Sequence, residues 1–118
     1  MDEEVEHYLA SEGYDINFAL AKLRMDIERE LRRVLEKRLT TQDPTNIKGK
    51  FLSARSLFRE FTKQYPEYKG MYGSFDYILK ICNAAIHGQN ISQGHAQEAF
   101  YMGLKILDEL KTVDKNNL

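Results

Sequence analysis

Apolar residues recur at steps of three and four through most of this chain, and that spacing limits its fold more than any other feature. Such steps put side chains on one face of an α-helix, whereas a strand needs strict alternation. The most regular stretch follows steps of 4, 3, 4, 3 and 4 (Ile47, Phe51, Ala54, Phe58, Phe61 and Tyr65). No segment shows sustained strand alternation, so the sequence predicts an all-α protein.

Capping residues and helix breakers divide this pattern into five expected helices. These cover residues 2–10, 16–39, 47–65, 75–87 and 93–113. Asp15, Ser74 and Ser92 are the expected N-caps, because their side-chain oxygens accept hydrogen bonds from the first helical turn. Pro66 is expected to end the third helix, and Gly88 to end the fourth in a left-handed conformation. The short connections predict an antiparallel up-and-down bundle of four main helices plus a short N-terminal helix.

Two of the expected helices carry apolar stripes that predict the core. The first stripe lies within residues 16–39 (Ile16, Leu20, Leu23, Ile27, Leu31, Val34 and Leu35). The second lies within residues 93–113 (Ala96, Ala99, Phe100, Gly103, Ile106, Leu107 and Leu110). We therefore expect these two helices to supply much of the buried surface.

Length and composition indicate one globular domain over residues 1–118. Its core is expected at about 15–112, after a short N-terminal helix in 1–14 and before a polar tail in 113–118. The 42% hydrophobic and 30% charged residues are values of a globular protein and argue against wholesale disorder. The single cysteine excludes an internal disulfide and suits a reducing compartment. No signal-peptide or membrane-spanning run is present, so we expect a cytoplasmic protein, either complete or a fragment of a longer one.

Charge is distributed unevenly along the chain. Residues 1–15 carry six acidic side chains and no Lys or Arg, whereas residues 16–69 carry 13 Lys and Arg against seven acidic residues. A basic middle segment attracts phosphate backbones, and the candidate nucleic-acid-binding residues in it are Lys48, Lys50, Arg55 and Arg59. The alternative is that these charges are only the solvated faces of amphipathic helices.

Common catalytic and cofactor motifs are absent from the sequence. There is no Gly-rich phosphate loop, HExxH helix, CxxC pair or G-x-S-x-G turn. The three histidines and one cysteine are too scattered to predict a zinc site. We therefore expect neither a metal nor a cofactor.

The stretch LKICNAAIHGQNIS, residues 79–92, holds the candidate catalytic residues. On a helix, Lys80, Asn83 and His87 fall on one polar stripe. A histidine can move a proton while a cation and an amide hold a phosphodiester. The alternative is structural, because a histidine in the last turn of a helix interacts favourably with the helix dipole and an asparagine can bond a neighbouring helix.

The overall layout resembles the HEPN superfamily (higher eukaryote and prokaryote nucleotide-binding domains). The likeness rests on DINFALAKLRMDIERELRRVLEKR, and on ICNAAIHG followed by SQGHAQEAFYMGLKILDELK, and it spans most of residues 15–112. The resemblance implies a helical bundle that dimerises through its motif helix. Many members are metal-independent endoribonucleases of bacterial toxin–antitoxin, phage-defence or stress systems.

The family motif is an arginine, an adjacent polar residue and then a histidine, written R-x4–6-H. The resemblance assigns His87 and Asn83 to the last two of these, while Cys82 stands in the place of the arginine. Cysteine lacks the fixed charge and paired donors that hold a phosphate. Lys80 lies at an allowed spacing but offers only a point charge.

Two hypotheses follow from the resemblance and its departure. The first is a non-catalytic interaction or regulatory module that dimerises through the helix carrying Asn83 and His87, with RNA or a partner protein as the alternatives for what it binds. The second is a weak metal-independent endoribonuclease that uses His87 as general acid and base, with Asn83 and Lys80 orienting the phosphate.

Overall fold

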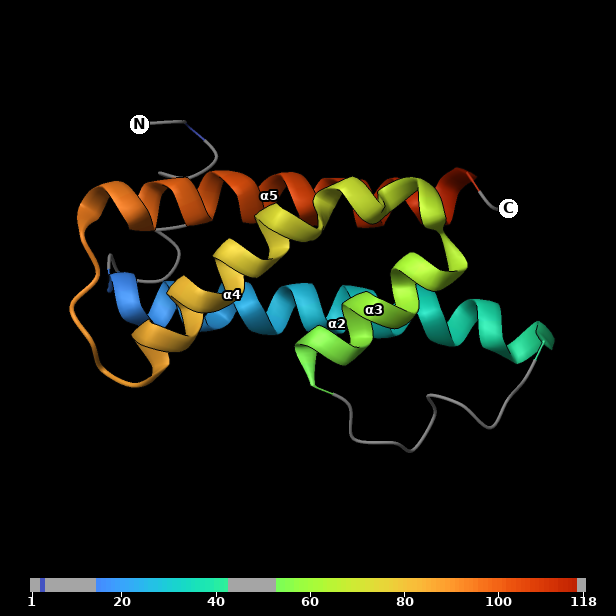
Figure 1. Cartoon of the computed structure of the whole chain (residues 1–118), viewed down its shortest axis with the longest axis horizontal. Coiled ribbons are helices and arrows are strands. Elements are labelled where there is room, and N and C mark those ends of the chain that lie inside the picture. Colours follow the sequence, from blue (N-terminus) through green and yellow to red (C-terminus); the bar gives the residue numbers. More distant parts are fainter. Residues whose placement is uncertain (1–2, 4–14, 43–52, 117–118) are drawn as a thin grey trace.

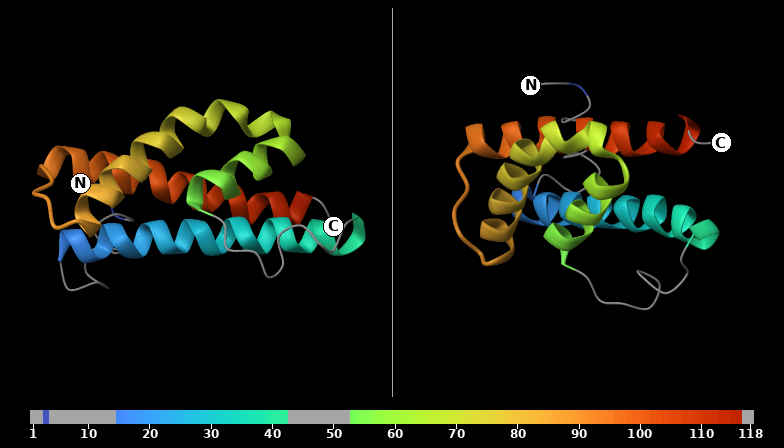
Figure 2. Two further views of the ribbon diagram at one scale, coloured as in Figure 1. Left: turned by 60° about the horizontal axis from the view of Figure 1, so that its bottom comes forward. Right: turned by 45° about the vertical axis from the view of Figure 1, so that its right-hand side comes forward.

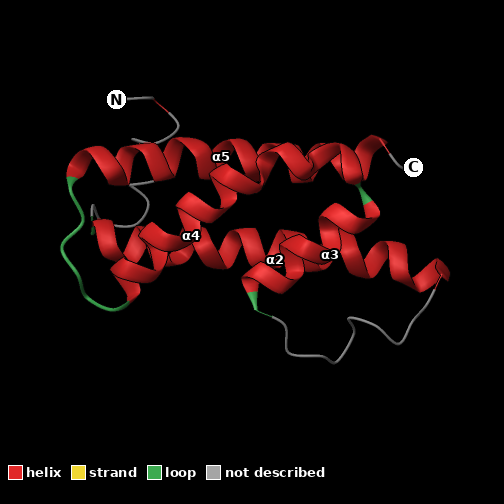
Figure 3. Ribbon diagram, viewed as in Figure 1, coloured by secondary structure: helices red, strands yellow, loops and turns green. Residues whose placement is uncertain are grey.

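The all-α prediction is confirmed by the computed structural model, which describes residue 3 and residues 15–42 and 53–116. The helices are α2 (Ile16–Gln42), α3 (Ala54–Gln64), the 3-10 helix η1 (Pro66–Met71), α4 (Tyr72–Ile86) and α5 (Gln93–Asn116), and no strand occurs in these ranges. Within the described residues, the loops in Figure 3 lie at the ends of helices and in the connection between α4 and α5. Almost all of the expected N-terminal helix lies outside the described residues, as do residues 47–52.

Three long helices set the architecture. Helices α2 and α5 run in the same direction, and α4 runs back in the opposite direction, packed against both (Figures 1 and 2). Helix α3 and η1 form a shorter arm that leads into α4. Directions therefore alternate for α2, α4 and α5, whereas the finer prediction of four alternating main helices after an N-terminal one is not confirmed.

Several helix ends differ from the expected ones. Ser53 caps α3 by accepting a hydrogen bond at Oγ from the Ser56 N–H at 3.2 Å, so the described helix is much shorter than the expected one. Pro66 is the first residue of η1, because its fixed backbone angle suits the start of a helix. Helix α4 already begins at Tyr72, so the prediction that Ser74 is its N-cap was wrong.

Other predicted helix ends are confirmed. Asp15 Oδ1 accepts a hydrogen bond from the Phe18 N–H at 3.1 Å, and Ser92 Oγ accepts one from the His95 N–H at 3.1 Å. Gly88 has a φ of 74°, which is the left-handed conformation predicted for it after α4. The last helix was expected to end near Val113, and α5 continues to Asn116.

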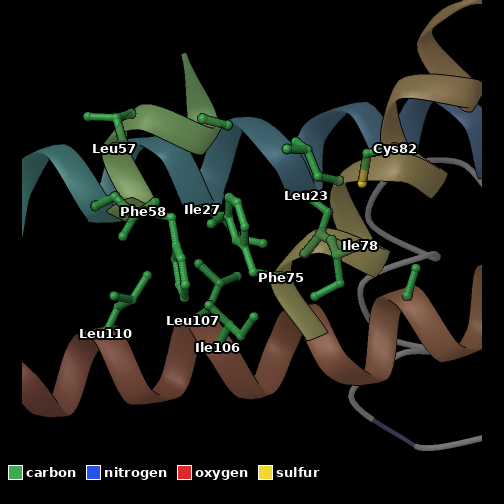
Figure 4. Packing of buried hydrophobic residues seen from close by; sticks show 14 of the residues in the cluster. Leu23, Ile27, Leu57, Phe58, Phe75, Ile78, Cys82, Ile106, Leu107 and Leu110 are labelled. Atoms are coloured by element: carbon green, nitrogen blue, oxygen red, sulfur yellow. The ribbon is translucent and has the colours of Figure 1, made fainter. Parts of the chain in front are cut away.

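The core follows the predicted stripes closely. Every predicted inward residue of α2 except the half-buried Ile16 is buried, and so is the whole predicted stripe of α5. Figure 4 shows side chains from α2, α3, α4 and α5 meeting in this core. Helix α4 adds the buried residues Phe75, Ile78, Leu79, Cys82 and Ala85. These contacts fix the position of the helix that carries the candidate site.

Gly103 allows α2 and α5 to pack closely. A Cβ atom built on Gly103 would lie 2.6 Å from Leu23 Cδ2 and 3.0 Å from Leu23 Cγ. Leu23 is fully buried, so its side chain has little room to move away. The absence of a side chain at Gly103 is therefore required by the packing of these two helices.

We expect Gly103→Ala to lower the free energy of unfolding by about 1 kcal/mol, because overpacking outweighs the gain in helix propensity. Urea denaturation measures the change. Gly94→Ala in the same helix is the matched control, since nothing lies within 4 Å of its added Cβ. The control is expected to be neutral or slightly stabilising. Equal stability of the two variants would contradict close packing at Gly103.

Candidate functional site

Lys80 and Asn83 lie on α4, and His87 is the residue that ends it. Lys80 and His87 are exposed, whereas Asn83 is half-buried. The three residues come from one side of the helix as predicted, but the side chains of Lys80 and Asn83 have different partners. The three predicted residues therefore do not form one hydrogen-bonded cluster.

Asn83 is bonded to α2 through an arginine that the sequence did not single out. Arg24 Nη1 donates a hydrogen bond to Asn83 Oδ1 at 2.7 Å, and Arg24 Nε donates to Glu28 Oε1 at 2.9 Å. The carboxylate and the amide together orient a half-buried guanidinium. A guanidinium thus lies beside Asn83, although it comes from a different helix than the family motif implies.

Lys80 takes part in a charge network one turn earlier on α4. Its Nζ lies 3.2 Å from Asp76 Oδ2, and Asp76 Oδ1 pairs with Arg55 of α3. Hydrogen bonds from Arg55 first, and from Lys80 second, lower the pKa of the Asp76 carboxyl below its ordinary value. The same pair raises the pKa of Arg55. Asp76 therefore forms ion pairs with both a candidate catalytic residue, Lys80, and a candidate nucleic-acid-binding residue, Arg55.

His87 is exposed at the end of α4. Its backbone N–H donates to the carbonyl of Asn83 at 3.0 Å, and Gly88 then reverses the chain. Asn17 of α2 donates from Nδ2 to the carbonyls of Ala85 and Gln89, at 3.4 Å in each case. The backbone around His87 is thus fixed on α2, while the imidazole remains accessible to solvent.

Cys82 occupies the place of the family arginine and points into the core. Its side chain is fully buried in the cluster that includes Leu23 and Ile78 (Figure 4). Burial raises the pKa of its thiol to about 12. The thiolate that nucleophilic or metal chemistry needs is therefore scarcely populated at neutral pH.

The structure describes two of the four candidate nucleic-acid-binding residues, Arg55 and Arg59, which lie one turn apart on α3. Lys48 and Lys50 lie outside the described residues, Arg55 is paired with Asp76, and Arg59 is exposed on α3. Other cations of the basic middle segment form ion pairs with nearby carboxylates (Lys22, Arg24, Arg29, Arg33 and Lys63). This pairing favours the interpretation of the charges as solvated helix faces.

Helices α2 and α4 each carry exposed apolar side chains next in sequence to residues that bond between them. Phe18, Met25 and Ile86 are 59%, 64% and 47% exposed. Phe18 and Met25 are seven residues apart, and so lie on one face of α2. Each of the three directly follows a residue that bonds between these two helices (Asn17, Arg24 and Ala85). We call Phe18, Met25 and Ile86 the α2–α4 patch.

Sequence reasoning missed Arg24 and the α2–α4 patch for related reasons. Arg24 was counted among the charges of an amphipathic helix, and nothing local to it indicates a partner 59 residues away. A signal was present in the patch residues, however. Phe18 and Met25 are large apolar residues that lie off the predicted core stripe of their helix. Such residues are candidates for an interface.

Metal and membrane signals are also absent from the described part of the chain. No group of three His, Cys, Asp or Glu side chains within residues 15–42 and 53–116 has the arrangement of a metal site. None of the helices in those ranges combines the length and the apolar character needed to cross a bilayer.

The geometry thus joins Asn83 to Arg24 and Lys80 to Asp76, and it leaves His87 open to solvent. Comparisons with known proteins add nothing to this description: no family model matches the chain, and neither a curated protein nor a solved structure is significantly similar to it.

Proposed function

We propose that this chain is a HEPN-like helical module that dimerises through the α2–α4 patch and acts as a non-catalytic interaction or regulatory domain. The resemblance of the motif helix suggests an RNA-associated role in a bacterial defence or stress system, in the cytoplasm. The observation that carries the proposal is the exposure of the patch residues Phe18, Met25 and Ile86 beside the bond between Arg24 and Asn83.

The α2–α4 patch has the character of an interface. Large apolar side chains exposed together, with polar groups around them, are typical of surfaces that bind another protein. Arg24 and Asn83 lie next to the patch and are held in place by their mutual bond. A fixed guanidinium at the edge of an apolar patch supplies specificity when two copies meet.

The candidate catalytic groups support a binding role over catalysis. The amide oxygen of Asn83 accepts a bond from Arg24, and the charge of Lys80 is directed to Asp76. Cys82 is buried and offers no cation. His87 is thus the one residue of the predicted set whose side chain has no partner among the described residues.

Dimerisation is tested by light scattering and analytical ultracentrifugation of the wild type and of the Phe18→Glu/Met25→Glu double variant. We expect the wild type to dimerise and the variant to dissociate at least about 100-fold more readily, because two charges would be buried at the interface. Tyr101→Glu, at an exposed residue of α5, is the matched control and is expected to dimerise normally. A monomeric wild type at high concentration contradicts the proposal.

The second candidate function is a weak metal-independent endoribonuclease. It is favoured by one observation, the guanidinium of Arg24 at 2.7 Å from Asn83 Oδ1, which supplies the kind of group that the motif lacks at Cys82. In this alternative His87 moves the proton, Asn83 and Arg24 hold the phosphate, and Lys80 adds charge. Arg24 would first have to turn toward the substrate.

Incubation with mixed RNA in EDTA separates the two functions. The non-catalytic proposal predicts the same background degradation by the wild type, His87→Ala and Arg24→Gln. His87 is exposed, so its substitution is expected to leave the fold intact, which circular dichroism checks. Cleavage that disappears in His87→Ala and falls in Arg24→Gln would establish the ribonuclease and overturn the non-catalytic assignment.

A further inference from the structure

A groove lies between η1 with the start of α4 on one side and the middle of α5 on the other. It has a volume of about 740 Å³. Tyr68 and Met71 of η1 and Ser74 of α4 line one side, and α5 lines the other (Tyr101, Met102, Lys105, Ile106, Asp108 and Glu109). None of these residues belongs to the α2–α4 patch or to the contacts around Asn83. The groove is therefore a separate feature of the molecule.

The lining combines apolar and aromatic side chains with carboxylates. The apolar part of the lining suits the hydrocarbon body of a ligand. It consists of one aromatic ring, two thioethers and one aliphatic side chain (Tyr68, Met71, Met102 and Ile106). Asp108 and Glu109 are exposed, and none of the ion pairs between described residues involves them. Burial first, and then the charges of Glu109 and Glu67, raise the pKa of Tyr68. The groove thus has an apolar wall near unpaired negative charge.

A cation already occupies one aromatic surface in the groove. Lys105 Nζ lies 4.6 Å from the centroid of the Tyr101 ring, within the range of a cation–π contact. Tyr101 is 48% exposed, so its ring is accessible to a ligand as well. The ammonium of Lys105 thus occupies the ring surface that a ligand ammonium would take, and Asp108 and Glu109 follow within one turn of Lys105 on the same helix.

We propose that this groove binds a small organic cation, an amine with an apolar or aromatic body. The body packs on Tyr68, Met71 and Met102, and the ammonium binds at Tyr101 with Asp108 and Glu109, displacing Lys105 from the ring. Two carboxylates against one ammonium in the lining favour a cation over an anion.

Three probes with the same carbon skeleton test the charge preference: phenethylamine, phenethyl alcohol and phenylacetate. Each is titrated into the labelled full chain at neutral pH and low salt, and backbone amide shifts are followed by NMR. We expect saturable shifts at Met71, Met102 and Ile106, with the amine binding about fivefold more tightly than the alcohol, because exposed ion pairs contribute modestly. The carboxylate is expected to bind most weakly. The absence of saturable shifts with the amine, or tighter binding of phenylacetate, overturns the proposal.

Two surface variants test the assigned groups. Asp108→Asn/Glu109→Gln is expected to weaken amine binding about fivefold and to leave alcohol binding unchanged. Lys105→Gln is expected to strengthen amine binding about threefold, since it removes the competing cation from Tyr101. Weaker amine binding by Lys105→Gln would show that Lys105 does not compete with the ligand for the Tyr101 ring, and would overturn the proposal.

Discussion

Cys82→Arg is expected to lower the free energy of unfolding by more than about 4 kcal/mol and to leave little folded protein, because it places an unpaired charge in the core. Cys82 is fully buried and packs among apolar side chains of α2 and α4. Arginine cannot lose its charge at any ordinary pH, and its side chain is far larger than the space left by a thiol. The positive charge of Arg24, which also acts on the Cys82 thiol, would oppose it further.

Circular dichroism and urea denaturation measure this effect, and Cys82→Ala is the matched control. The control removes one sulfur from the core and is expected to cost only about 1 kcal/mol. A folded Cys82→Arg protein that melts within a few degrees of the control would show that residue 82 can turn outward. That outcome would restore a motif arginine on α4. Unfolding would instead leave Arg24 as the arginine that can act together with Asn83.

The apolar stripes of α2 and α5 were predictable because helix periodicity is local. Residues such as Leu20, Leu31 and Phe100 are buried as their spacing predicts. The C-cap at Gly88 was predictable for the same reason, since only its own backbone conformation is involved. The fold class and most of the described core could thus be predicted from the spacing of apolar residues within each helix.

The boundaries of α3 and α4 were not predictable from such patterns. Ser53 and Ser74 are equally good N-cap residues by type, yet only Ser53 caps a helix. The sequence KGMYG, residues 69–73, lies between the expected helices 47–65 and 75–87 and contains two glycines. In the structure η1 and the start of α4 include it. Two tyrosines contact core rings here: Tyr68, just before the segment, contacts Phe61, and the half-exposed Tyr72 within it contacts Phe58. Tertiary packing has overridden local propensity here.

The pairs that define the candidate site were hidden for another reason. Arg24 and Asn83 are 59 residues apart in sequence, and Arg55 and Asp76 are 21 apart. Which charged residues of two amphipathic helices meet depends on how those helices cross, and the polar pattern of each helix does not contain that information. The polar stripe of α4 was correct as a stripe, but its partners on α2 and α3 had to come from the structure.

The second large effect is expected at Phe58, a buried contact between α3 and α4. Phe58 is fully buried, and its ring stacks on Phe75 with centroids 4.3 Å apart and an interplanar angle of 9°. We expect Phe58→Ala to lower the free energy of unfolding by about 3–5 kcal/mol, because it leaves a large cavity in a core shared by several helices. Arg55 lies one turn before Phe58 on α3, so its pairing with Asp76 is expected to weaken as α3 loosens.

A double-mutant cycle separates the stacking of the two rings from the burial of their surface. Phe58→Leu and Phe75→Leu keep apolar side chains in place and remove the aromatic pair, and urea denaturation gives the free energy of unfolding for each single and double variant. We expect a coupling energy of about 1 kcal/mol, typical of a buried aromatic pair. Coupling near zero, with a loss below about 1 kcal/mol for Phe58→Ala, would mean that α3 does not pack on α4 through this residue. Arg55 would then lack the rigid support that keeps it beside Asp76, and the charge network around Lys80 would have to be held by α4 alone.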